Sequence, residues 1–559
     1  MGLRKKNILT LLDERTKIYG DRIALGMRTP VGWKEFSYKG LGLISRKLAC
    51  HLILDLDVKK GERLAILSES KPEFGACVFA AILAGMTTVP LDIKLTKYEL
   101  ISILSDCEPA VMLVSHSYAG LALELQKEIP AIKHIIVMDE PAYNQELPSI
   151  YNLPDRYEAK WRPRSSKSTA LIIYTSGTTG APKGVEITFN NMLTQLDDLE
   201  DALNAILPNR HITVLSILPM NHLFELTVGF ATFLHFGFSV YYTQSLKPKD
   251  ILGIMRDKKV DFMIVVPAFL KLLKTSIENE LNSLPKYKRA VFGLMYKLAK
   301  YIPSYKIKKI MFKPVHDKFG GHFIGCISGG APLDIEVGSF FERIGLQVYQ
   351  GYGLSETSPV VSVNTDKRNN LASVGRPLKS FDAKIDKETG ELLLRGPSVM
   401  KGYHNQPEAT SSVLDSDGWL HTGDIANIDK DGHIFITGRI KNMIVLSGGK
   451  KVFPEEVEAV LEKSPYINEV CVLGTSKTFG SKGGTEEVTA VIYPKEDLFE
   501  RFSDSELNNF IRVEVKNISN QLTQYKRPNN IVVVKEPLPK TTTRKVKRKD
   551  VKELVSAGN

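Results

Sequence analysis

The sequence predicts an α/β protein with a large N-terminal domain of layered α/β sheets and a small α+β C-terminal domain. The chain has 559 residues, which is more than one hydrophobic core usually organises. Short apolar runs alternate with amphipathic segments through much of its length, a pattern typical of parallel strands covered by helices. Several of these runs lead into glycine-rich loops, the place where ligands of such sheets bind.

The first 170 residues contain three apolar, β-branched runs that we expect to be strands, at 63–67, 110–114 and 134–138. Residues 79–83 lie in a predicted helix that ends near Gly85. Later in the chain we expect further strands at 170–174, 185–187, 262–267, 323–327 and 346–349. The C-terminal domain is predicted to contain a helix at 455–463 and strands at 469–473, 487–493 and 530–534.

Composition restricts the class of protein. Hydrophobic residues make up 43% and charged residues 25%, as in ordinary globular proteins. The apolar stretch 74–86 is too short to span a bilayer and 226–242 is interrupted by polar residues, so we expect both in the core. We find no signal peptide or myristoylation motif and expect a cytoplasmic protein. Five scattered cysteines indicate a reducing compartment rather than disulfides or a zinc site: Cys50, Cys77, Cys107, Cys326 and Cys471.

Residues 174–188 read YTSGTTGAPKGVEIT and lie between two predicted strands. The glycines allow backbone N–H groups to turn toward one point, and the hydroxyl side chains and Lys183 add donors and a positive charge. The loop differs from the nucleotide-hydrolysing pattern GxxxxGK[ST], because Gly184 follows the lysine and a strand follows the loop. The stretch therefore predicts a site for nucleotide phosphates.

The residues YTSGTTGAPKG resemble the phosphate loop of the adenylate-forming superfamily, which includes acyl- and aryl-CoA synthetases, luciferases and adenylation domains of peptide synthetases. The resemblance extends over about residues 20–555, with further motifs in the same order. It implies that ATP is the nucleotide and that its phosphates bind the residues Thr175, Ser176, Gly177, Thr178, Thr179, Gly180 and Lys183.

Two later glycine loops complete the implied nucleotide site. SGGAPL at 328–333 and QGYGLSET at 350–357 each follow a predicted strand. Glu356, together with Thr175, would bind Mg²⁺, a hard cation that prefers carboxylate and phosphate oxygens. Ser355 stands where the family usually has threonine. The residues expected around the adenine and phosphates are Gly329, Gly330, Ala331, Pro332, Gly351, Tyr352, Gly353 and Ser355.

The run GWLHTGDIANIDKDGHIFITGRIKNMI resembles the superfamily over its whole length. The resemblance implies that Asp424 binds the ribose hydroxyls and that Arg439 adds a contact to ribose or phosphate. Lys441 stands at the family's hinge. We therefore divide the chain into residues 1–439, a large AMP-binding domain, and residues 440–559, a small mobile domain.

Lys183, Glu356 and Lys545 are the expected catalytic residues. Lys545 lies in LPKTTTRKVKR and matches the family lysine that neutralises the α-phosphate and the carboxylate during adenylation. Arg544 replaces the usual glycine, so a residue that permits positive φ is lost beside this lysine. Because Lys545 must enter for adenylation and leave to admit the thiol, the resemblance implies a swivel of the small domain about Lys441.

Two positions bear on the substrate pocket. His222 follows the segment SILPMN; a lone histidine beside apolar residues is usually structural, whereas the family has a histidine or aromatic residue lining the acyl pocket here. The sequence leaves both interpretations of His222 open. Phe189 stands where many relatives have a histidine after the phosphate loop.

Residues 285–318 carry ten Lys and Arg and a single acidic residue, Asp317. Residues 290–298 place their apolar side chains on one helical face. The segment is either a solvated basic helix packed on the body or a basic amphipathic surface that contacts anionic lipid, which would put the protein on the inner face of a membrane. The net charge of +11 suits a nucleotide, a CoA phosphate or such a surface.

The resemblance is strongest to long-chain fatty acyl-CoA synthetases. It implies that a fatty acid and ATP give acyl-AMP and pyrophosphate, and that CoA then takes the acyl group. An alternative keeps the first step and transfers the acyl group to the phosphopantetheine of an acyl carrier protein. A non-catalytic acyl- or nucleotide-binding module is disfavoured because Lys183, Glu356, Asp424 and Lys545 are all present. No nucleic-acid-binding module is recognisable, so nucleic acid is not an expected partner.

Overall fold

The computed structural model describes residues 8–141, 146–175, 182–365, 369–446, 450–476, 486–540 and 546–557. The chain forms two compact units. Unit 1 comprises Met1–Asp382 and Leu394–Leu420, and unit 2 comprises Ala383–Leu393 and His421–Asn559.

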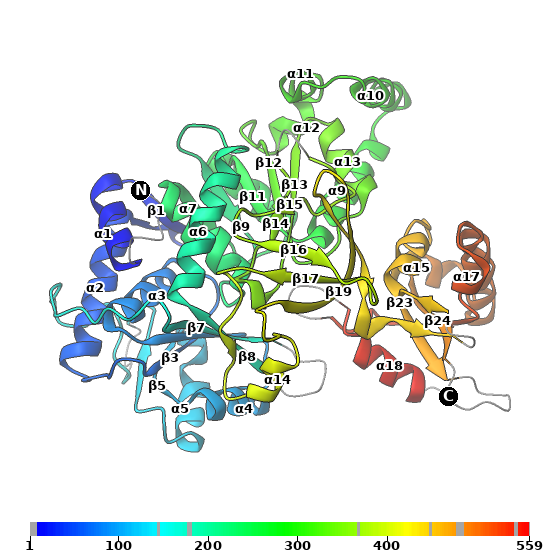
Figure 1. Ribbon diagram of the computed structural model, residues 1–559. Helices are drawn as coiled ribbons and strands as arrows, with labels where there is room; N and C mark the ends of the chain where they lie inside the picture. The colour runs from blue at the N-terminus through cyan, green and yellow to red at the C-terminus, as the bar shows by residue number, and fades with distance from the viewer. Residues whose placement is uncertain are drawn as a thin grey trace. The chain divides into compact units, whose positions relative to one another are not determined.

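Unit 1 contains a mostly parallel sheet in the order β18-β8-β7-β4-β3-β5-β6. Figure 1 labels the strands β8, β7, β3 and β5 of this sheet. Its inner strands are buried on both faces and therefore read as continuous apolar runs, as in Pro109–Val114. Only β8, among the described strands of this sheet, is antiparallel to both of its neighbours. The strands are β3 (Arg63–Leu67), β4 (Thr87–Leu91), β5 (Pro109–Val114), β6 (His134–Val137), β7 (Thr169–Thr175), β8 (Lys183–Thr188) and β18 (Gly402–Tyr403).

A second sheet of unit 1 has the order β15-β14-β13-β12-β11-β9-β10-β1-β2. The run from β13 to β1 is parallel, and the strands at both edges are antiparallel. The strands are β1 (Ile23–Thr29), β2 (Gly32–Ser37), β9 (Thr213–Ser216), β10 (Ser239–Tyr242), β11 (Phe262–Val265), β12 (Gly325–Ser328), β13 (Gln347–Tyr352), β14 (Ser362–Val363) and β15 (Arg376–Pro377).

A layer of helices separates these two sheets. Helix α3 (Pro72–Ala84) contacts strands of both sheets and is buried along almost its whole length. A Cβ atom on Gly75 would lie 2.5 Å from the Phe230 ring, so only glycine allows this close packing. As predicted, the helix ends at Gly85, which has φ of +71°.

Unit 1 contains further helices. They are α1 (Ile8–Tyr19), α2 (Tyr38–Leu54), α4 (Lys97–Cys107), α5 (Ala119–Glu128), α6 (Phe189–Asn204), α7 (Phe233–Phe236), α8 (Pro248–Asp257), α9 (Pro267–Ser283), α10 (Lys286–Ala299), α11 (Tyr305–Met311), α12 (Lys313–Lys318), α13 (Ile335–Arg343) and α14 (Pro407–Ser411). Short helices are η2 (His116–Tyr118), the π-helix η3 (Glu225–Thr232) and η4 (Ser355–Thr357).

Unit 2 has its own core, in which α15 (Pro454–Leu461) and α17 (Asp504–Ile518) pack on a sheet of β23 (Ile467–Ser476), β24 (Glu486–Pro494) and β25 (Asn530–Val533). Arg548 of α18 (Arg548–Ala557) pairs with Glu455 and Glu458 of α15. The remaining elements are β16 (Asp382–Ile385), β17 (Glu391–Arg395), β19 (Leu420–Ile428), β20 (Ile434–Arg439), β21 (Ile444–Val445), β22 (Lys451–Val452), α16 (Asp497–Arg501), η6 (Ile440–Asn442), η7 (Ser519–Gln521) and η8 (Gln524–Lys526).

The architecture confirms the predicted fold class. Each predicted strand corresponds to an observed strand within a few residues, and residues 226–242 form a buried helix and strand rather than a membrane span. None of the helices in the described ranges is long and apolar enough to cross a membrane. All five cysteines are buried and unpaired, as expected.

Residues 421–439 group with unit 2, whereas we placed the domain boundary after Arg439. The compactness of a unit does not by itself locate a hinge. The mobility of the small domain and the hinge at Lys441 therefore stay predictions.

Candidate functional site

The two strands around the predicted phosphate loop are paired. Thr175 at the end of β7 lies opposite Lys183 at the start of β8, and its hydroxyl donates to the Lys183 carbonyl at 3.5 Å. The antiparallel pairing therefore brings together the residues on either side of the loop, as the strand–loop–strand pattern predicted. The loop residues Ser176, Gly177, Thr178, Thr179 and Gly180 lie outside the described residues.

Glu356 lies in η4, where Tyr403 fixes its side chain. The Tyr403 hydroxyl donates a hydrogen bond of 2.8 Å to Glu356 Oε1. Burial and the nearby Glu356 carboxylate raise the pKa of Tyr403, so the phenol stays protonated and remains a donor. Lys183 Nζ lies 4.9 Å from the centroid of the same ring. Tyr403 thus links the predicted metal ligand to the predicted phosphate-binding lysine.

Tyr403 was missed by sequence reasoning. It belongs to β18, a strand of two residues in which Tyr403 pairs with Val185 of β8, more than two hundred positions earlier in the chain. No local periodicity predicts such a pairing. The only signal in the sequence is the Gly402-Tyr403 pair itself, which is too short to interpret alone.

Glu186 holds β18 in place on β8. It accepts hydrogen bonds from Lys401 Nζ at 2.6 Å, His404 Nδ1 at 2.7 Å and Thr169 Oγ1 at 2.7 Å. Burial opposes ionisation of this carboxyl, but the hydrogen bonds from His404, Lys401 and Thr169 outweigh it and lower the pKa of Glu186 to about 2. The carboxylate therefore fastens the residues on both sides of Tyr403, and sequence reasoning missed it as well.

The loop that carries Glu356 is supported from α6. Gln195 is buried, and its amide donates to the Val360 carbonyl at 2.9 Å and accepts from the Val360 N–H at 3.1 Å. Gly353 lies against the same loop, since a Cβ atom there would meet the Pro359 carbonyl oxygen at 1.7 Å. Phe189, the predicted departure from histidine, begins α6 and is buried.

The two predicted adenine loops leave neighbouring strands. Ser328 of β12 lies opposite Gln350 of β13, so the segments that follow them start side by side. Gly330 has φ of +82°, which favours glycine at this turn. A Cβ on Gly329 would lie 3.0 Å from the Phe224 ring. The structure thus brings together the loops that contain the residues Gly329, Gly330, Ala331, Pro332, Gly351, Tyr352, Gly353 and Ser355.

His222 lies half-buried in the turn before η3, and its backbone N–H donates to the Pro219 carbonyl. Glu225 follows it and is completely buried, with its carboxylate accepting a hydrogen bond from Ser216. Burial raises the pKa of Glu225 to about 8, and the Ser216 hydrogen bond only partly opposes this. A Cβ on Gly229 would lie 2.2 Å from the carboxyl, so the π-helix encloses a largely neutral acid.

In unit 2, Asp424 and Arg439 face each other across β19 and β20. Arg439 Nε donates to Asp424 Oδ1 at 2.5 Å, and Asp424 is buried. The structure therefore brings together the two residues expected to bind ribose. Lys441 lies exposed in η6, two residues after Arg439. Lys545 and Arg544 lie outside the described residues.

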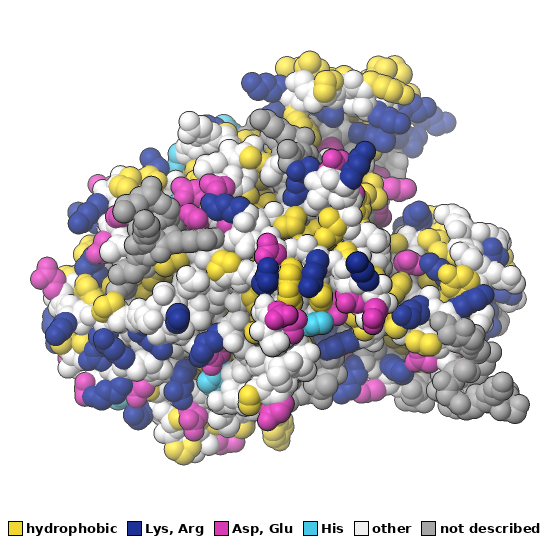
Figure 2. Space-filling view, viewed as in Figure 1, with side chains coloured by type: hydrophobic (Ala, Val, Ile, Leu, Met, Phe, Trp, Pro, Cys, Tyr) yellow, Lys and Arg dark blue, Asp and Glu magenta, His cyan; other side chains and the backbone are white. Residues whose placement is uncertain are grey.

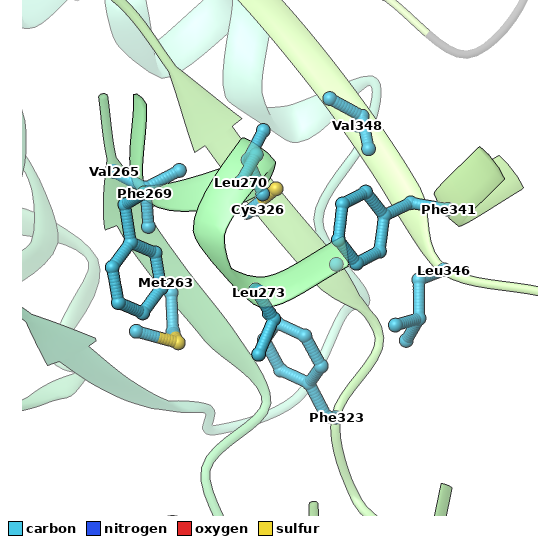
Figure 3. A pocket seen from close by; sticks show the side chains of 11 residues that line it. Met263, Val265, Phe269, Leu270, Leu273, Phe323, Cys326, Phe341, Leu346 and Val348 are labelled. Carbon is cyan, nitrogen blue, oxygen red and sulfur yellow. The ribbon is translucent and has the colours of Figure 1, made fainter. Parts of the chain in front are cut away.

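Apolar side chains line two of the cavities formed by the described residues of unit 1. One, of about 260 Å³, lies between α9, α13 and the strands β11, β12 and β13, with Phe269, Phe323 and Phe341 among its walls (Figure 3). The other, of about 640 Å³, is lined by α1, α2, α3, α6, η3 and α7. Its few polar lining groups include Arg15 and His235, which are hydrogen-bonded to each other at 3.0 Å.

A preformed cage of protein ligands for a metal is absent from the described part of the chain, where no three His, Cys, Asp or Glu side chains cluster suitably. A site with one carboxylate still suits Mg²⁺, which usually keeps waters and binds through one or two carboxylates and substrate phosphates. Glu356 offers such a carboxylate in a half-buried position, held through Oε1 by Tyr403.

A family profile described as AMP-binding enzyme matches residues 12–404, and one described as AMP-binding enzyme C-terminal domain matches residues 456–545. The chain therefore belongs to the AMP-binding enzyme family. This family comprises adenylate-forming acid–thiol ligases.

Several relatives have established names. The chain is 30% identical to the long-chain-fatty-acid–CoA ligase FadD15 of Mycobacterium bovis over 448 residues, 76% of this chain and 73% of the relative. It is 28% identical to a long-chain-fatty-acid–CoA ligase of Escherichia coli O157:H7 over 592 aligned positions, 98% of this chain and 95% of the relative. A luciferin 4-monooxygenase of Photinus pyralis is 29% identical and covers 88% of this chain and 84% of the relative.

Solved structures share the fold over the whole chain. ATP-bound MatB of Rhodopseudomonas palustris has a TM-score of 0.75 at 22% identity, covering 98% of this chain and 99% of that structure. The o-succinylbenzoate CoA synthetase MenE of Bacillus subtilis, in complex with its acyl-adenylate intermediate, has a TM-score of 0.73 at 25% identity, with 97% of each chain covered.

Proposed function

We propose that the protein activates a long-chain fatty acid with ATP to give acyl-AMP and pyrophosphate, and then transfers the acyl group to the thiol of CoA. The relatives named as long-chain-fatty-acid–CoA ligases support this substrate. The luciferin 4-monooxygenase is similar to this chain at nearly the same identity, although its name states a different substrate. Similarity alone therefore does not select the acid, and the choice has to rest on the pocket of this chain.

The apolar cavity beside η3 is the observation that carries the choice of a fatty acid. Its walls are mainly aliphatic and aromatic, as in many small-molecule sites. Leu226 in its wall follows His222 by four residues, and Leu171 precedes Thr175 by four. Each buried methylene contributes about 0.8 kcal/mol, so such walls favour a long alkyl chain over a short or polar acid.

The proposed first step joins the fatty acid to AMP. A carboxylate oxygen of the acid attacks the α-phosphorus of ATP, a new O–P bond forms, and the bond to pyrophosphate breaks. Lys183 and the loop from Thr175 would hold the phosphates, and Lys545 would offset negative charge on the α-phosphate and carboxylate. Asp424 would accept hydrogen bonds from the ribose diol, and Arg439, which already orients Asp424, would contact ribose or phosphate.

Mg²⁺ belongs to this proposal through Glu356, with Thr175 as the second expected ligand. When bound, the ion would neutralise charge on the phosphate oxygens. The hydrogen bond from Tyr403 would keep the Glu356 carboxylate in one orientation before the nucleotide arrives, so that the site needs little rearrangement on binding.

In the proposed second step the thiol sulfur attacks the acyl carbon, a thioester forms and AMP leaves. Lys545 would first have to withdraw, and a swivel of the small domain about Lys441 would allow this. A polar residue suits that position, because a hinge side chain meets solvent in both arrangements; Lys441 is exposed in the structure.

ATP–pyrophosphate exchange over a series of acids from acetate to oleate tests the substrate. We expect exchange to rise with chain length, and exchange confined to short or aromatic acids would refute the proposal. Ala231→Trp, which places an indole ring in the cavity beside η3, should lower exchange with long acids and spare short ones. Leu273→Trp, in the wall of the other cavity, is the matched control.

Lys545→Ala should abolish exchange, and the nearby exposed Lys549→Ala should not. Undiminished exchange by Lys545→Ala would refute the role given to this lysine. The same assay with CoA or with a holo-acyl carrier protein as acceptor separates the main proposal from the alternative one. In the alternative, an acidic carrier protein would dock on the basic segment 285–318.

A further inference from the structure

Helices α10 and α11 expose a row of large apolar side chains to solvent. Tyr287, Val291, Leu294 and Leu298 lie at positions i, i+4, i+7 and i+11 of α10 and therefore form one stripe along the helix. Tyr301, Ile307 and Ile310 continue the exposed apolar surface into the connection and α11. These seven side chains are between 51% and 79% exposed. We refer to them as the apolar stripe.

The opposite face of α10 holds the helix on the body of unit 1. Phe292 contacts Phe312 edge to face at 5.2 Å, Tyr296 lies 5.9 Å from Phe340, and Ala299 is completely buried. Thus α10 already uses one face for packing, and its exposed stripe is a second apolar face. A solvated helix fixed on a core through one face needs no such second face.

Basic side chains surround the stripe. Six exposed Lys and Arg belong to α10, α11 and the connection between them: Lys286, Lys288, Arg289, Lys297, Lys300 and Lys306. The only acidic residue of 285–318, Asp317, pairs with Lys313 at 2.6 Å. Figure 2 shows hydrophobic and basic side chains gathered over α10 and α11 at the top of the molecule. The surface is therefore both apolar and strongly positive.

The combination of apolar and basic side chains indicates what kind of partner this surface binds. Contiguous exposed apolar surface marks an interaction site, and the cationic border selects a negatively charged partner. Helix α10 has 14 residues and is too short to span a bilayer. A helix of this length can instead lie parallel to the bilayer surface, at the level of the lipid headgroups. Tyr287 and Tyr301 carry the amphipathic rings that reside at such an interface.

We propose that the surface formed by α10 and α11 docks on the anionic face of a lipid bilayer. The apolar stripe enters the headgroup region, and the six basic side chains contact lipid phosphates. The core against which α10 packs also contains the 260 Å³ apolar cavity, so docking places the membrane over the part of unit 1 that encloses it. The inference does not depend on the identity of the substrate.

Cosedimentation of the full chain with vesicles tests the proposal. We expect binding to vesicles of phosphatidylcholine with phosphatidylglycerol, little binding to phosphatidylcholine alone, and weaker binding as salt is raised. Val291→Ser/Leu294→Ser/Leu298→Ser should lower the partition coefficient at least about tenfold through lost apolar burial. Lys288→Gln/Arg289→Gln/Lys297→Gln should lower it at least about tenfold through lost attraction to anionic lipid.

Matched controls carry the same changes elsewhere. Leu123→Ser/Val513→Ser/Leu554→Ser removes three other exposed apolar side chains, and Lys94→Gln/Lys430→Gln/Lys463→Gln lowers the net charge by the same amount. Both controls should bind as the wild type does. The proposal is overturned if the α10 variants bind like their controls, if neutral vesicles bind equally well, or if the chain binds an acidic carrier protein but no vesicle.

Discussion

Replacement of Tyr403 by phenylalanine removes one hydroxyl group and tests whether Glu356 acts as a fixed carboxylate. A hydrogen bond to a charged group contributes about 1.5–3 kcal/mol. Glu356 and Tyr403 are half-buried, so water replaces part of the lost bond and we expect a loss of about 1–2 kcal/mol. This loss corresponds to roughly 5–30-fold lower kcat/KM for pyrophosphate exchange.

The assay is exchange measured as a function of Mg²⁺ concentration. Tyr403→Phe should need more Mg²⁺ for half-maximal rate while its ring still faces Lys183. Tyr403→Leu also removes the cation–π contact, which contributes about 0.5–1 kcal/mol, and should lower kcat/KM by a further factor of roughly two to five. Tyr157→Phe, which removes a surface tyrosine hydroxyl bonded to Asp155, is the control.

A double-mutant cycle of Tyr403→Phe with Glu356→Gln tests whether the Tyr403 hydroxyl affects the exchange rate through Glu356. If Tyr403 acts by orienting Glu356, the hydroxyl contributes nothing once the carboxylate is gone, and the two losses are far from additive. Additive losses, or an unchanged Mg²⁺ requirement in Tyr403→Phe, would refute the reasoning. Equal melting temperatures for wild type and variant would exclude a general loss of fold as the cause.

Three further predictions concern stability. Burial raises the pKa of Glu225 to about 8 from an ordinary value near 4.5, so the wild type should lose stability as pH rises through this window, and Glu225→Gln should lose less. The pKa of Glu186 is lowered to about 2, so its contribution is present above about pH 4.5 and is lost as pH falls toward 2; Glu186→Gln should cost about 1–3 kcal/mol at pH 7. Gly353→Ala should destabilise unit 1 by about 1–3 kcal/mol and impair exchange, because its Cβ meets the Pro359 carbonyl.

Denaturant unfolding measured from pH 3 to pH 9 checks the two carboxyl predictions together. A Glu225→Gln curve parallel to that of the wild type between about pH 5 and 8 would contradict the first. A Glu186→Gln variant as stable as the wild type at pH 7 would contradict the second. Gly351→Ala is the comparison for Gly353→Ala, since its Cβ would meet nothing closer than 3.3 Å.

Local sequence signals predicted the fold well where strands are buried on both faces. Apart from Arg63, the runs 63–67 and 110–114 are apolar throughout, because helices cover both sides of the sheet. The helix end at Gly85 was predictable because a left-handed residue is needed there. The π-helix η3 was not, since its apolar residues suit either helical period.

The site was predictable only where its residues follow one another along the chain. Thr175 and Lys183 flank a single loop, and a strand on either side is enough to place them opposite each other. Tyr403 and Glu186 depend on the pairing of a two-residue strand with β8, which the sequence does not encode locally. Gln195 could not be predicted for the same reason, because its hydrogen-bond partner Val360 lies far along the chain.

The placement of the cysteines also determines how this protein can be labelled. A thiol reacts as its thiolate, and burial raises the pKa of all five: Cys50, Cys77, Cys107, Cys326 and Cys471. The native chain should therefore give almost no background with maleimide dyes. A cysteine introduced at an exposed position such as Tyr301 would be a unique attachment point for a polarity-sensitive fluorophore, without prior removal of any natural thiol.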